Sequence, residues 1–242
     1  MLISVVIPLR DEESSLLQLF DELSSAFSEV SFDREFILVS DGSRDRTPVI
    51  LQEKSRDWPV LRPLILSKSG GQTSALRHGI AAARGEWIGT LDGALQDDPR
   101  DLRRMLELTA PGFEAIIGYR RQRAARDSIL KSFCSWAANA SVSLLFFRRQ
   151  KDLGCPVRLM RASLAKRLLL RDGMHRFIPI LCMLEGAAIR QIAVAHRGRK
   201  HGSSHYGISR VFKVLPDILR LWVLRVKQRE KWSRSSITRD GT

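Results

Sequence analysis

Acidic side chains gather in the stretch Leu91-Asp92-Gly93-Ala94-Leu95-Gln96-Asp97-Asp98-Pro99, which follows the apolar segment of residues 86–90. A strand that ends in such a stretch presents carboxylates at the carboxyl edge of a sheet, where open α/β sheets bind ligands. Asp92 and the side-chain oxygen of Gln96 are therefore candidate ligands for a hard divalent cation that holds a diphosphate. An acidic turn that caps a helix beginning at Pro99 is the alternative interpretation.

Repeated units of one strand and one helix position this stretch. Apolar runs predict strands at residues 3–7, 35–39, 60–66, 87–91 and 114–119. Helical spacing of apolar residues follows each of the first three strands, and Asp11 and Ser14 are candidate caps of the first helix. This order of elements predicts an α/β fold with a mostly parallel sheet, flanked by helices and joined by right-handed crossovers.

Length and composition indicate one globular domain with an appendage. The 242 residues are 44% hydrophobic and 27% charged, and the three cysteines have no ligand-like spacing, which fits a reducing compartment. The formal net charge of +14 predicts an anionic partner: nucleic acid, an anionic lipid surface or a phosphorylated substrate. We find no signal peptide and no run of about 18 apolar residues, so we expect a cytoplasmic chain that contacts a membrane peripherally.

Two apolar stripes at helical spacing are flanked by Lys and Arg, one from Ile129 to Phe147 and one from Phe212 to Val226. Each is either a core-facing helix or a helix that lies in a membrane interface. We favour an anionic membrane over nucleic acid, because the basic residues surround apolar stripes rather than exposed aromatic residues on strands. The expected organisation is a domain of residues 1–210 with an interfacial helix inserted at about 127–147, an amphipathic helix at 211–230 and a disordered basic tail at 231–242.

Several short motifs follow one another in a characteristic order. They are Val5-Val6-Ile7-Pro8 with Asp11-Glu12-Glu13, Asp41-Gly42-Ser43-Arg44-Asp45, Gly71-Gln72-Thr73-Ser74-Ala75-Leu76, Gly154-Cys155, Met174-His175-Arg176-Phe177-Ile178-Pro179, and His196-Arg197-x-Arg199-x-x-Gly202-x-Ser204-x-Tyr206-Gly207. In this order they resemble the family 2 glycosyltransferases of the GT-A fold, and more narrowly the dolichyl- and polyprenyl-phosphate sugar synthases. The resemblance extends over nearly the whole chain, from about residue 3 to residue 224.

The resemblance implies an inverting glycosyltransferase, which moves a sugar from a GDP- or UDP-linked donor to a dolichyl or undecaprenyl phosphate at a membrane surface. It implies a Mg²⁺ or Mn²⁺ ion that neutralises the leaving diphosphate. Donor nucleotide binding is implied for Pro8, Glu12, Asp41, Asp92 and Gly93, and the metal ligands are Asp92 and Gln96. The resemblance also implies that Arg199 contacts the donor phosphates and that Arg120, Lys131 and Ser135 hold the acceptor phosphate, a task that a guanidinium or an ammonium suits.

The acceptor needs no protein base, because a phosphate monoester with a second pKa near 6 is mostly dianionic at pH 7. Asp152 is a further candidate as a ligand of the sugar or of the backbone.

Five positions depart from the family pattern, and the first is Asp11, which replaces an Asn. Ala94 stands where relatives have the second Asp of Asp-x-Asp-x-Gln, Ser40 replaces an Asp before Asp41, Lys131 occupies an Arg position of some relatives, and His205 replaces a Lys. A weakened metal site is expected. The alternative hypothesis is a nucleotide-sugar or lipid-phosphate binding protein, or a scaffold, that kept the fold and lost the metal site.

Overall fold

The computed structural model describes residues 1–109, 111–120 and 151–197. The chain divides into two compact units, one of Met1–Arg126 with Asp152–Gly202 and one of Asp127–Lys151 with Ser203–Thr242. The fold described below is that of the first unit. The predicted interfacial helix, the helix at 211–230 and the basic tail lie outside the described residues and stay predictions.

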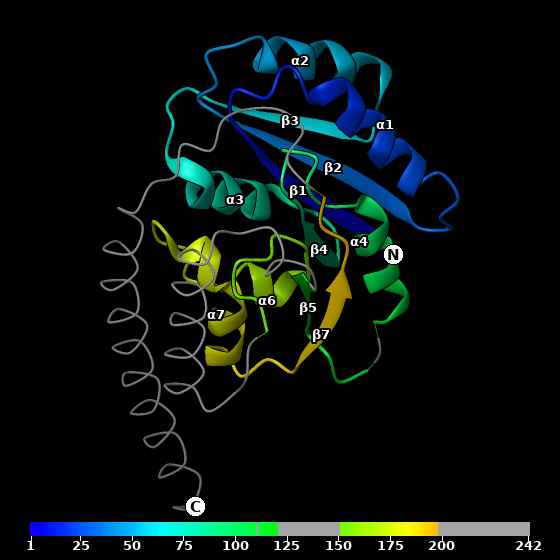
Figure 1. Ribbon diagram of the computed structural model, residues 1–242, viewed down its shortest axis with the longest axis vertical. Coiled ribbons are helices and arrows are strands. Elements are labelled where there is room, and N and C mark those ends of the chain that lie inside the picture. Colours follow the sequence, from blue (N-terminus) through cyan, green and yellow to red (C-terminus); the bar gives the residue numbers. More distant parts are fainter. Residues whose placement is uncertain (110, 121–150, 198–242) are drawn as a thin grey trace, which may run out of the picture. The chain divides into compact units, whose positions relative to one another are not determined.

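One sheet of seven strands forms the centre of this unit (Figure 1), in the order β3-β2-β1-β4-β6-β5-β7. The strands are β1 (Leu2–Leu9), β2 (Asp33–Asp41), β3 (Leu61–Leu66), β4 (Trp87–Thr90), β5 (Ala115–Arg120), β6 (Arg158–Arg161) and β7 (Ile189–Val194). Only β6 runs antiparallel to its neighbours, β4 and β5, so the prediction of a mostly parallel sheet is confirmed. Sequence analysis did not predict β6 or β7, since β6 is a four-residue strand with Arg at both ends.

Three of the described helices have a proline in their first turn, and one of these also has a side-chain cap. The described helices are α1 (Leu16–Ala26), α2 (Thr47–Asp57), α3 (Gly71–Ala82), α4 (Pro99–Glu107), α6 (Ala162–Ala165), the 3-10 helix η2 (Met174–Phe177) and α7 (Ile178–Leu184). Proline occupies one of the first two positions of α2, α4 and α7, where its missing amide costs no helical hydrogen bond. Asp98 caps α4 by accepting a bond of 3.0 Å from the amide of Arg100. The helix predicted at Pro99 is thereby confirmed.

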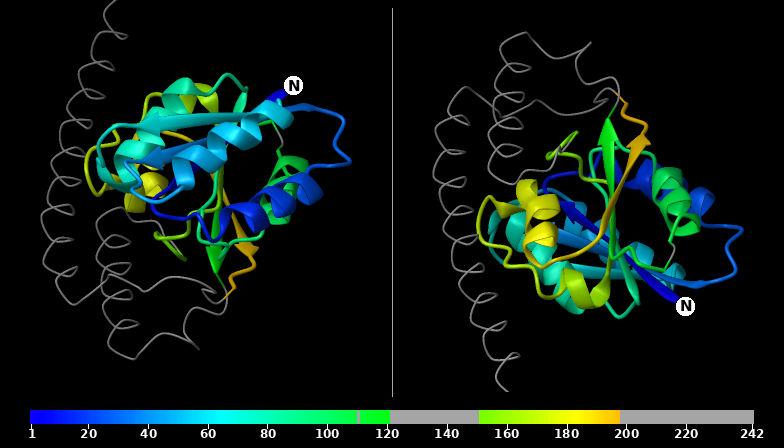
Figure 2. Two further views of the ribbon diagram at one scale, coloured as in Figure 1. Left: turned by 90° about the horizontal axis from the view of Figure 1, so that it is seen from above. Right: turned by 90° about the horizontal axis from the view of Figure 1, so that it is seen from below.

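Helices cover both faces of the sheet (Figure 2), so the central strands are buried on both sides. Val5 and Ile7 of β1 join a core cluster with Leu23 of α1 and Leu102 of α4. The intervening residue Val6 faces α3, where a Cβ at Gly79 would lie 2.3 Å from the Val6 side chain. Alternate residues of β1 thus contact opposite helical layers, as the period of a strand requires.

At the amino edge of the sheet, Glu35 joins three strands and the chain that leads into β4. Its side chain is only 2% exposed and accepts hydrogen bonds from Ser4, from Arg62, and from both the amide and the side chain of Arg84. Burial alone raises the pKa of Glu35, but these bonds outweigh it and lower the pKa from 4.5 to about 2.

We predict that Glu35 contributes stability that is fully present above about pH 4.5 and is lost as the pH falls toward 2, since its pKa is lower in the folded state. The contribution is on the order of 3 kcal/mol. Urea unfolding at several pH values measures the free energy of unfolding. The natural protein should be more stable than Glu35→Gln near neutral pH, and this difference should shrink as the pH falls. The exposed control Glu29→Gln should match the natural protein at every pH. A constant gap between Glu35→Gln and the natural protein from pH 6 to pH 2.5 would contradict the prediction.

Candidate active site

Parallel pairing places the ends of three strands at one edge of the sheet. β1 pairs in parallel with β2 on one side and with β4 on the other. Their carboxyl ends carry Pro8, Asp41 and Asp92, so the structure brings together the predicted donor-binding residues that follow these strands. Gly93 lies against β1, because a Cβ there would approach Leu9 Cδ2 to 2.2 Å and the carbonyl oxygen of Pro8 to 3.2 Å. A side chain at position 93 would push the loop of residues 91–98, here called the acidic loop, away from β1.

Ser15 connects Glu12 to the acidic loop. Its hydroxyl lies 2.9 Å from Glu12 Oε2 and 3.4 Å from the carbonyl oxygen of Gly93. The loops after β1 and β4 are therefore joined directly through one side chain.

The loops after β1 and β2 exchange hydrogen bonds between acidic side chains and backbone amides. The Arg44 amide donates to Asp11 Oδ1 at 2.7 Å, and Asp11 has a positive φ of 52°. The amides of Glu13 and Thr47 donate to the carboxylate of Asp45, and these bonds lower its pKa against the effect of burial. Asp11 was predicted as a helix cap, and this was wrong: the helix begins at Leu16, and Asp11 ties two loops instead.

Asp41 holds the segment that leads into α3. Its carboxylate accepts bonds of 2.8 Å from the Ser69 hydroxyl, 2.8 Å from the Gly70 amide and 2.9 Å from the Gly71 amide. Gly42 permits this approach, because a Cβ there would lie 2.4 Å from the Ser69 amide nitrogen. Asp41 thus satisfies amides near the start of a helix, which carry partial positive charge.

A cavity of about 620 Å³ opens beside Asp41. It is lined by Arg10, Gly42, Ser43, Arg44, Pro48, Ile65, Leu66, Ser67, Lys68 and Ser69. Three of these side chains are cations, and the Arg10 guanidinium donates to Ser69 Oγ at 2.7 Å. The sequence did not lead us to predict Arg10, Lys68 or Ser69 as site residues. They closely follow β1 and β3, and this position could have indicated that they line a site.

The acidic loop is compact. Ala94 is 7% exposed, Leu95 is 3% exposed with a positive φ of 56°, and the Asp92 amide lies 3.4 Å from Asp97 Oδ2. Asp97 Oδ1 and His196 Nδ1 lie 3.7 Å apart, and neither atom has a hydrogen-bond partner among the described residues.

The described part of the chain contains no cluster of three or more His, Cys, Asp or Glu that could hold a metal ion. Asp92 and Gln96 stay the predicted ligands, and a divalent ion held by these two side chains would take its other ligands from diphosphate and water oxygens, as is common for Mg²⁺.

Arg120 forms a buried ion pair at the end of β5. Its Nε lies 2.6 Å from Asp152 Oδ2 and its Nη2 lies 3.0 Å from Asp152 Oδ1, with side-chain exposures of 11% and 4%. Burial opposes the charge on Arg120, but the bond and charge of Asp152 raise the pKa of the guanidinium. Asp152 also accepts from the Gly154 amide at 3.1 Å, so it is a backbone ligand, one of the two roles that the sequence left open. Lys131, Ser135, Arg199 and His205 lie outside the described residues.

Two further motif segments also meet. Thr73 Oγ1 of α3 lies 2.6 Å from His175 Nδ1 of η2 and accepts a bond of 3.1 Å from the Gly173 amide.

The model of the family described as glycosyl transferase family 2 matches residues 4–168, more than half of the chain. The chain belongs to this family.

Two curated relatives are similar over most of the chain. Dodecaprenyl-phosphate galacturonate synthase of Rhizobium johnstonii is 37% identical over 233 residues, which cover 94% of this chain and 68% of that protein. Undecaprenyl-phosphate 4-deoxy-4-formamido-L-arabinose transferase of Pseudomonas aeruginosa is 34% identical over 219 residues, which cover 90% of this chain and 64% of that protein. The chain spans about two thirds of the length of these relatives.

Solved structures show the same fold. Glucosyl-3-phosphoglycerate synthase from Mycobacterium tuberculosis in complex with UDP is similar with a TM-score of 0.68, at 17% identity, over 92% of this chain and 79% of that chain. The same enzyme in complex with Mn²⁺, UDP and glucosyl-3-phosphoglycerate gives a TM-score of 0.63 at 17% identity, over 92% of this chain and 79% of that chain. At this identity the likeness establishes the fold.

We predict that Asp152→Asn destabilises the protein by about 3 kcal/mol, because it leaves a buried guanidinium without its counter-charge. Adding Arg120→Gln should recover part of the loss, since the double variant has no unpaired charge. Denaturant unfolding measures both values. The control Arg167→Gln breaks an exposed pair with Glu185, at 3.5 Å, and should cost less than about 1 kcal/mol. Equal losses for Asp152→Asn and Arg167→Gln would show that the buried pair is not needed for folding.

Proposed function

We propose that this chain transfers a sugar from a nucleotide-diphosphate donor to a polyprenyl phosphate, with inversion at the sugar's C1. The observation that carries the proposal is the gathering of Pro8, Glu12, Asp41 and Asp92 at one sheet edge. Both curated relatives are named for transfer to polyprenyl phosphates, which supports this acceptor and does not favour the scaffold alternative.

In the proposed reaction, the phosphate dianion of the acceptor attacks C1 while the nucleoside diphosphate leaves. Arg120 stands at the acceptor side, where its guanidinium orients and partly neutralises the attacking phosphate. Asp92 and Gln96 would hold a divalent ion, which would supply charge neutralisation for the leaving diphosphate. No residue has to remove a proton, because the acceptor is already ionised.

The cavity beside Asp41 supports a uridine donor. Its described lining supplies donors from Arg10, Arg44, Lys68 and hydroxyl groups, whereas the Asp41 carboxylate already accepts three hydrogen bonds. Guanine presents two neighbouring N–H donor groups that need an acceptor, while uracil presents two carbonyl acceptors and one donor. A cavity rich in donors therefore matches uracil better.

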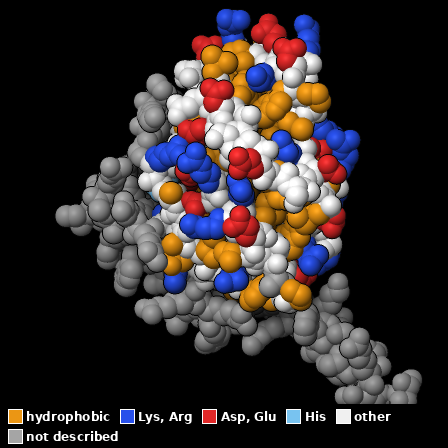
Figure 3. Space-filling model, turned by 90° about the vertical axis from the view of Figure 1, so that its right-hand side faces the viewer, with side chains coloured by type: hydrophobic (Ala, Val, Ile, Leu, Met, Phe, Trp, Pro, Cys, Tyr) orange, Lys and Arg blue, Asp and Glu red, His pale blue; other side chains and the backbone are white. Residues whose placement is uncertain are grey.

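The distribution of charge supports a peripheral position on the cytoplasmic face of an anionic membrane. The described residues carry 23 of the 40 Lys and Arg and 22 of the 26 Asp and Glu, so nearly all of the net charge of +14 belongs to residues 121–150 and 198–242. On the face shown in Figure 3, acidic and basic side chains are interspersed. No helix of the described residues is long and apolar enough to cross a membrane.

We predict that the protein binds anionic vesicles and that this binding, measured by flotation, weakens as the salt concentration rises. The reason is that each cation near an anionic surface adds about 1 kcal/mol of attraction.

We predict that a substitution on the donor side of the site removes nucleotide binding, whereas one on the acceptor side removes only sugar transfer. Asp41→Ala should abolish UDP binding, because it releases Ser69, which lines the cavity, together with the amides of Gly70 and Gly71. Arg120→Ala should leave UDP binding unchanged and reduce transfer at least a hundredfold, since it removes a charged hydrogen bond to the acceptor. The measurements are UDP titration calorimetry with Mn²⁺ and transfer from UDP-sugars to undecaprenyl phosphate in vesicles. UDP binding by Arg120→Ala also reports that this variant is folded. Equal loss of UDP binding in both variants would contradict the assignment of two sides, and tighter binding of GDP than UDP would exclude the uridine donor.

We predict that Ala94→Asp lowers the half-saturating Mn²⁺ concentration for UDP binding about tenfold, because it adds a carboxylate to a site that has Asp92 and Gln96. Without metal, the same variant should be less stable than the natural protein, since position 94 is only 7% exposed and the new charge lacks a partner. Ala94→Asn is the matched control and should shift the Mn²⁺ midpoint much less. An unchanged midpoint in Ala94→Asp would mean that another group already supplies the missing ligand.

A further inference from the structure

The chain that leaves β7 runs beside the acidic loop and the start of α4. The Ala195 amide donates to Asp101 Oδ2 at 2.6 Å, and the Arg197 amide donates to the carbonyl oxygen of Gln96 at 2.8 Å. The guanidinium of Arg104 donates to the carbonyl oxygen of Ala193. Backbone groups of residues 193–197 are thus fixed at three points on the loop and on α4.

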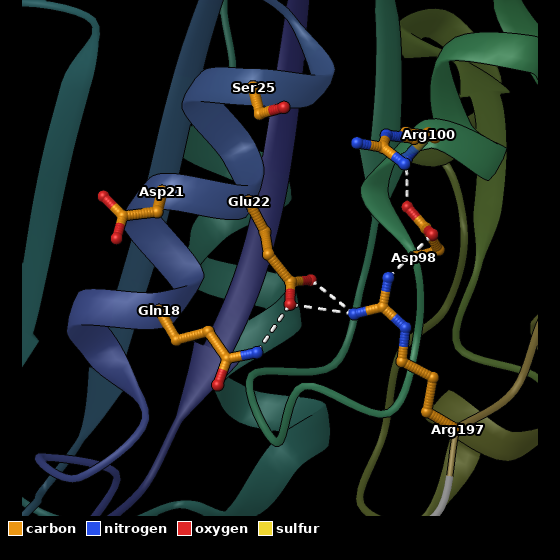
Figure 4. Close-up of a pocket in the computed structure, with 7 residues that line it drawn as sticks. All are labelled: Gln18, Asp21, Glu22, Ser25, Asp98, Arg100 and Arg197. Carbon is orange, nitrogen blue, oxygen red and sulfur yellow. Dashed lines mark hydrogen bonds and ion pairs between the residues drawn. The ribbon is translucent and has the colours of Figure 1, made fainter.

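The side chain of Arg197 extends this contact to α1 (Figure 4). Its Nη1 lies 2.8 and 2.9 Å from the two carboxylate oxygens of Glu22, and its Nη2 lies 2.7 Å from Asp98 Oδ2. Asp98 uses its other oxygen to cap α4 through the Arg100 amide, and Glu22 also accepts from Gln18 at 2.8 Å. One guanidinium therefore bridges α1 and the end of the acidic loop.

The three charged side chains are shielded enough for this bridge to matter. Side-chain exposures are 36% for Arg197, 19% for Glu22 and 20% for Asp98. They border a cavity of about 310 Å³ between α1 and α4. Arginine presents two parallel N–H groups and can hold two carboxylates at once, which a lysine cannot do with fixed geometry.

Two features make the acidic loop dependent on outside support. Leu95 has a positive φ of 56°, a conformation that costs a non-glycine residue on the order of 1 kcal/mol or more and persists only when its surroundings hold it. The carboxylate that would help a metal ion to order the loop is absent, because position 94 is Ala. The bonds from Arg197 hold the residues on the carboxyl side of Leu95, namely Gln96 and Asp98.

We propose that Arg197 is a positioning residue for donor binding: it links α1 to the acidic loop and so holds Asp92 and Gln96 in the arrangement that receives the metal and the diphosphate. The proposal rests on the proposed function, because it takes these two residues as the metal ligands.

The test compares Arg197→Gln and Arg197→Lys with Arg103→Gln. Arg103 is a matched control, since it lies on α4 and forms an exposed pair at 3.8 Å with Glu107 of the same helix. The first measurement uses the protein without nucleotide and follows hydrogen exchange at the amides of residues 195 and 197. Arg197→Gln should speed exchange there about tenfold relative to strand β1, Arg197→Lys should do so less, and Arg103→Gln should not.

The second measurement is the half-saturating Mn²⁺ concentration for UDP binding. It should rise about tenfold in Arg197→Gln, partly recover in Arg197→Lys and stay unchanged in Arg103→Gln. A purely structural role would instead lower the melting temperature and speed exchange across the whole sheet, with no change in the Mn²⁺ midpoint, and would overturn the proposal. If Arg197→Gln fails to fold, Glu22→Gln replaces it, because Glu22→Gln keeps the bond from Arg197 to Asp98.

Different results would refute the proposed function and the proposed role of Arg197. Absence of both UDP and GDP binding by the natural chain at any Mn²⁺ concentration would refute the proposed function, while the exchange measurement would still decide whether Arg197 holds the loop.

Discussion

Hydrogen bonds from backbone amides to carboxylates hold the functional edge of this protein together. Parallel strands end side by side, and the loops that follow them have no regular partners for their amides. Asp11, Asp41 and Asp45 accept such amides from a neighbouring loop, and Asp101 accepts one from the chain after β7. Each bond joins segments far apart in the sequence. The acidic residues at this edge thus hold together the loops that border the proposed donor site.

The sequence predicted the sheet well and the side-chain contacts poorly. β1, β2 and β4 are apolar runs because both of their faces are buried, so composition alone locates them. β6 has four residues with Arg at both ends, and β7 is a half-buried edge strand, so neither stands out. The Glu22–Arg197 and Arg120–Asp152 pairs join residues distant in sequence, and no local pattern specifies which charges will meet.

Sequence also located the candidate site residues without giving their surroundings. The positions of Pro8, Asp41 and Asp92 follow from strand ends and from the family resemblance. The Asp41 carboxylate accepts hydrogen bonds from Ser69, Gly70 and Gly71 because Gly42 lets the two segments approach closely. This close approach is a property of the folded backbone. The roles of Lys131, Ser135 and Arg199 stay predictions.

The ion pair at the end of β5 joins two points of the chain that lie far apart in the sequence. Arg120 and Asp152 are in direct contact, so the described chain before residue 121 and the described chain after residue 150 meet at one fixed point. Lengthening a segment with pinned ends costs little, about 0.6 kcal/mol for each doubling of its length. A change of length between residues 120 and 152 therefore need not alter the strand register or the bonds among the loops after β1, β2 and β4. Evolution can vary this stretch of the sequence while the framework around it stays unchanged.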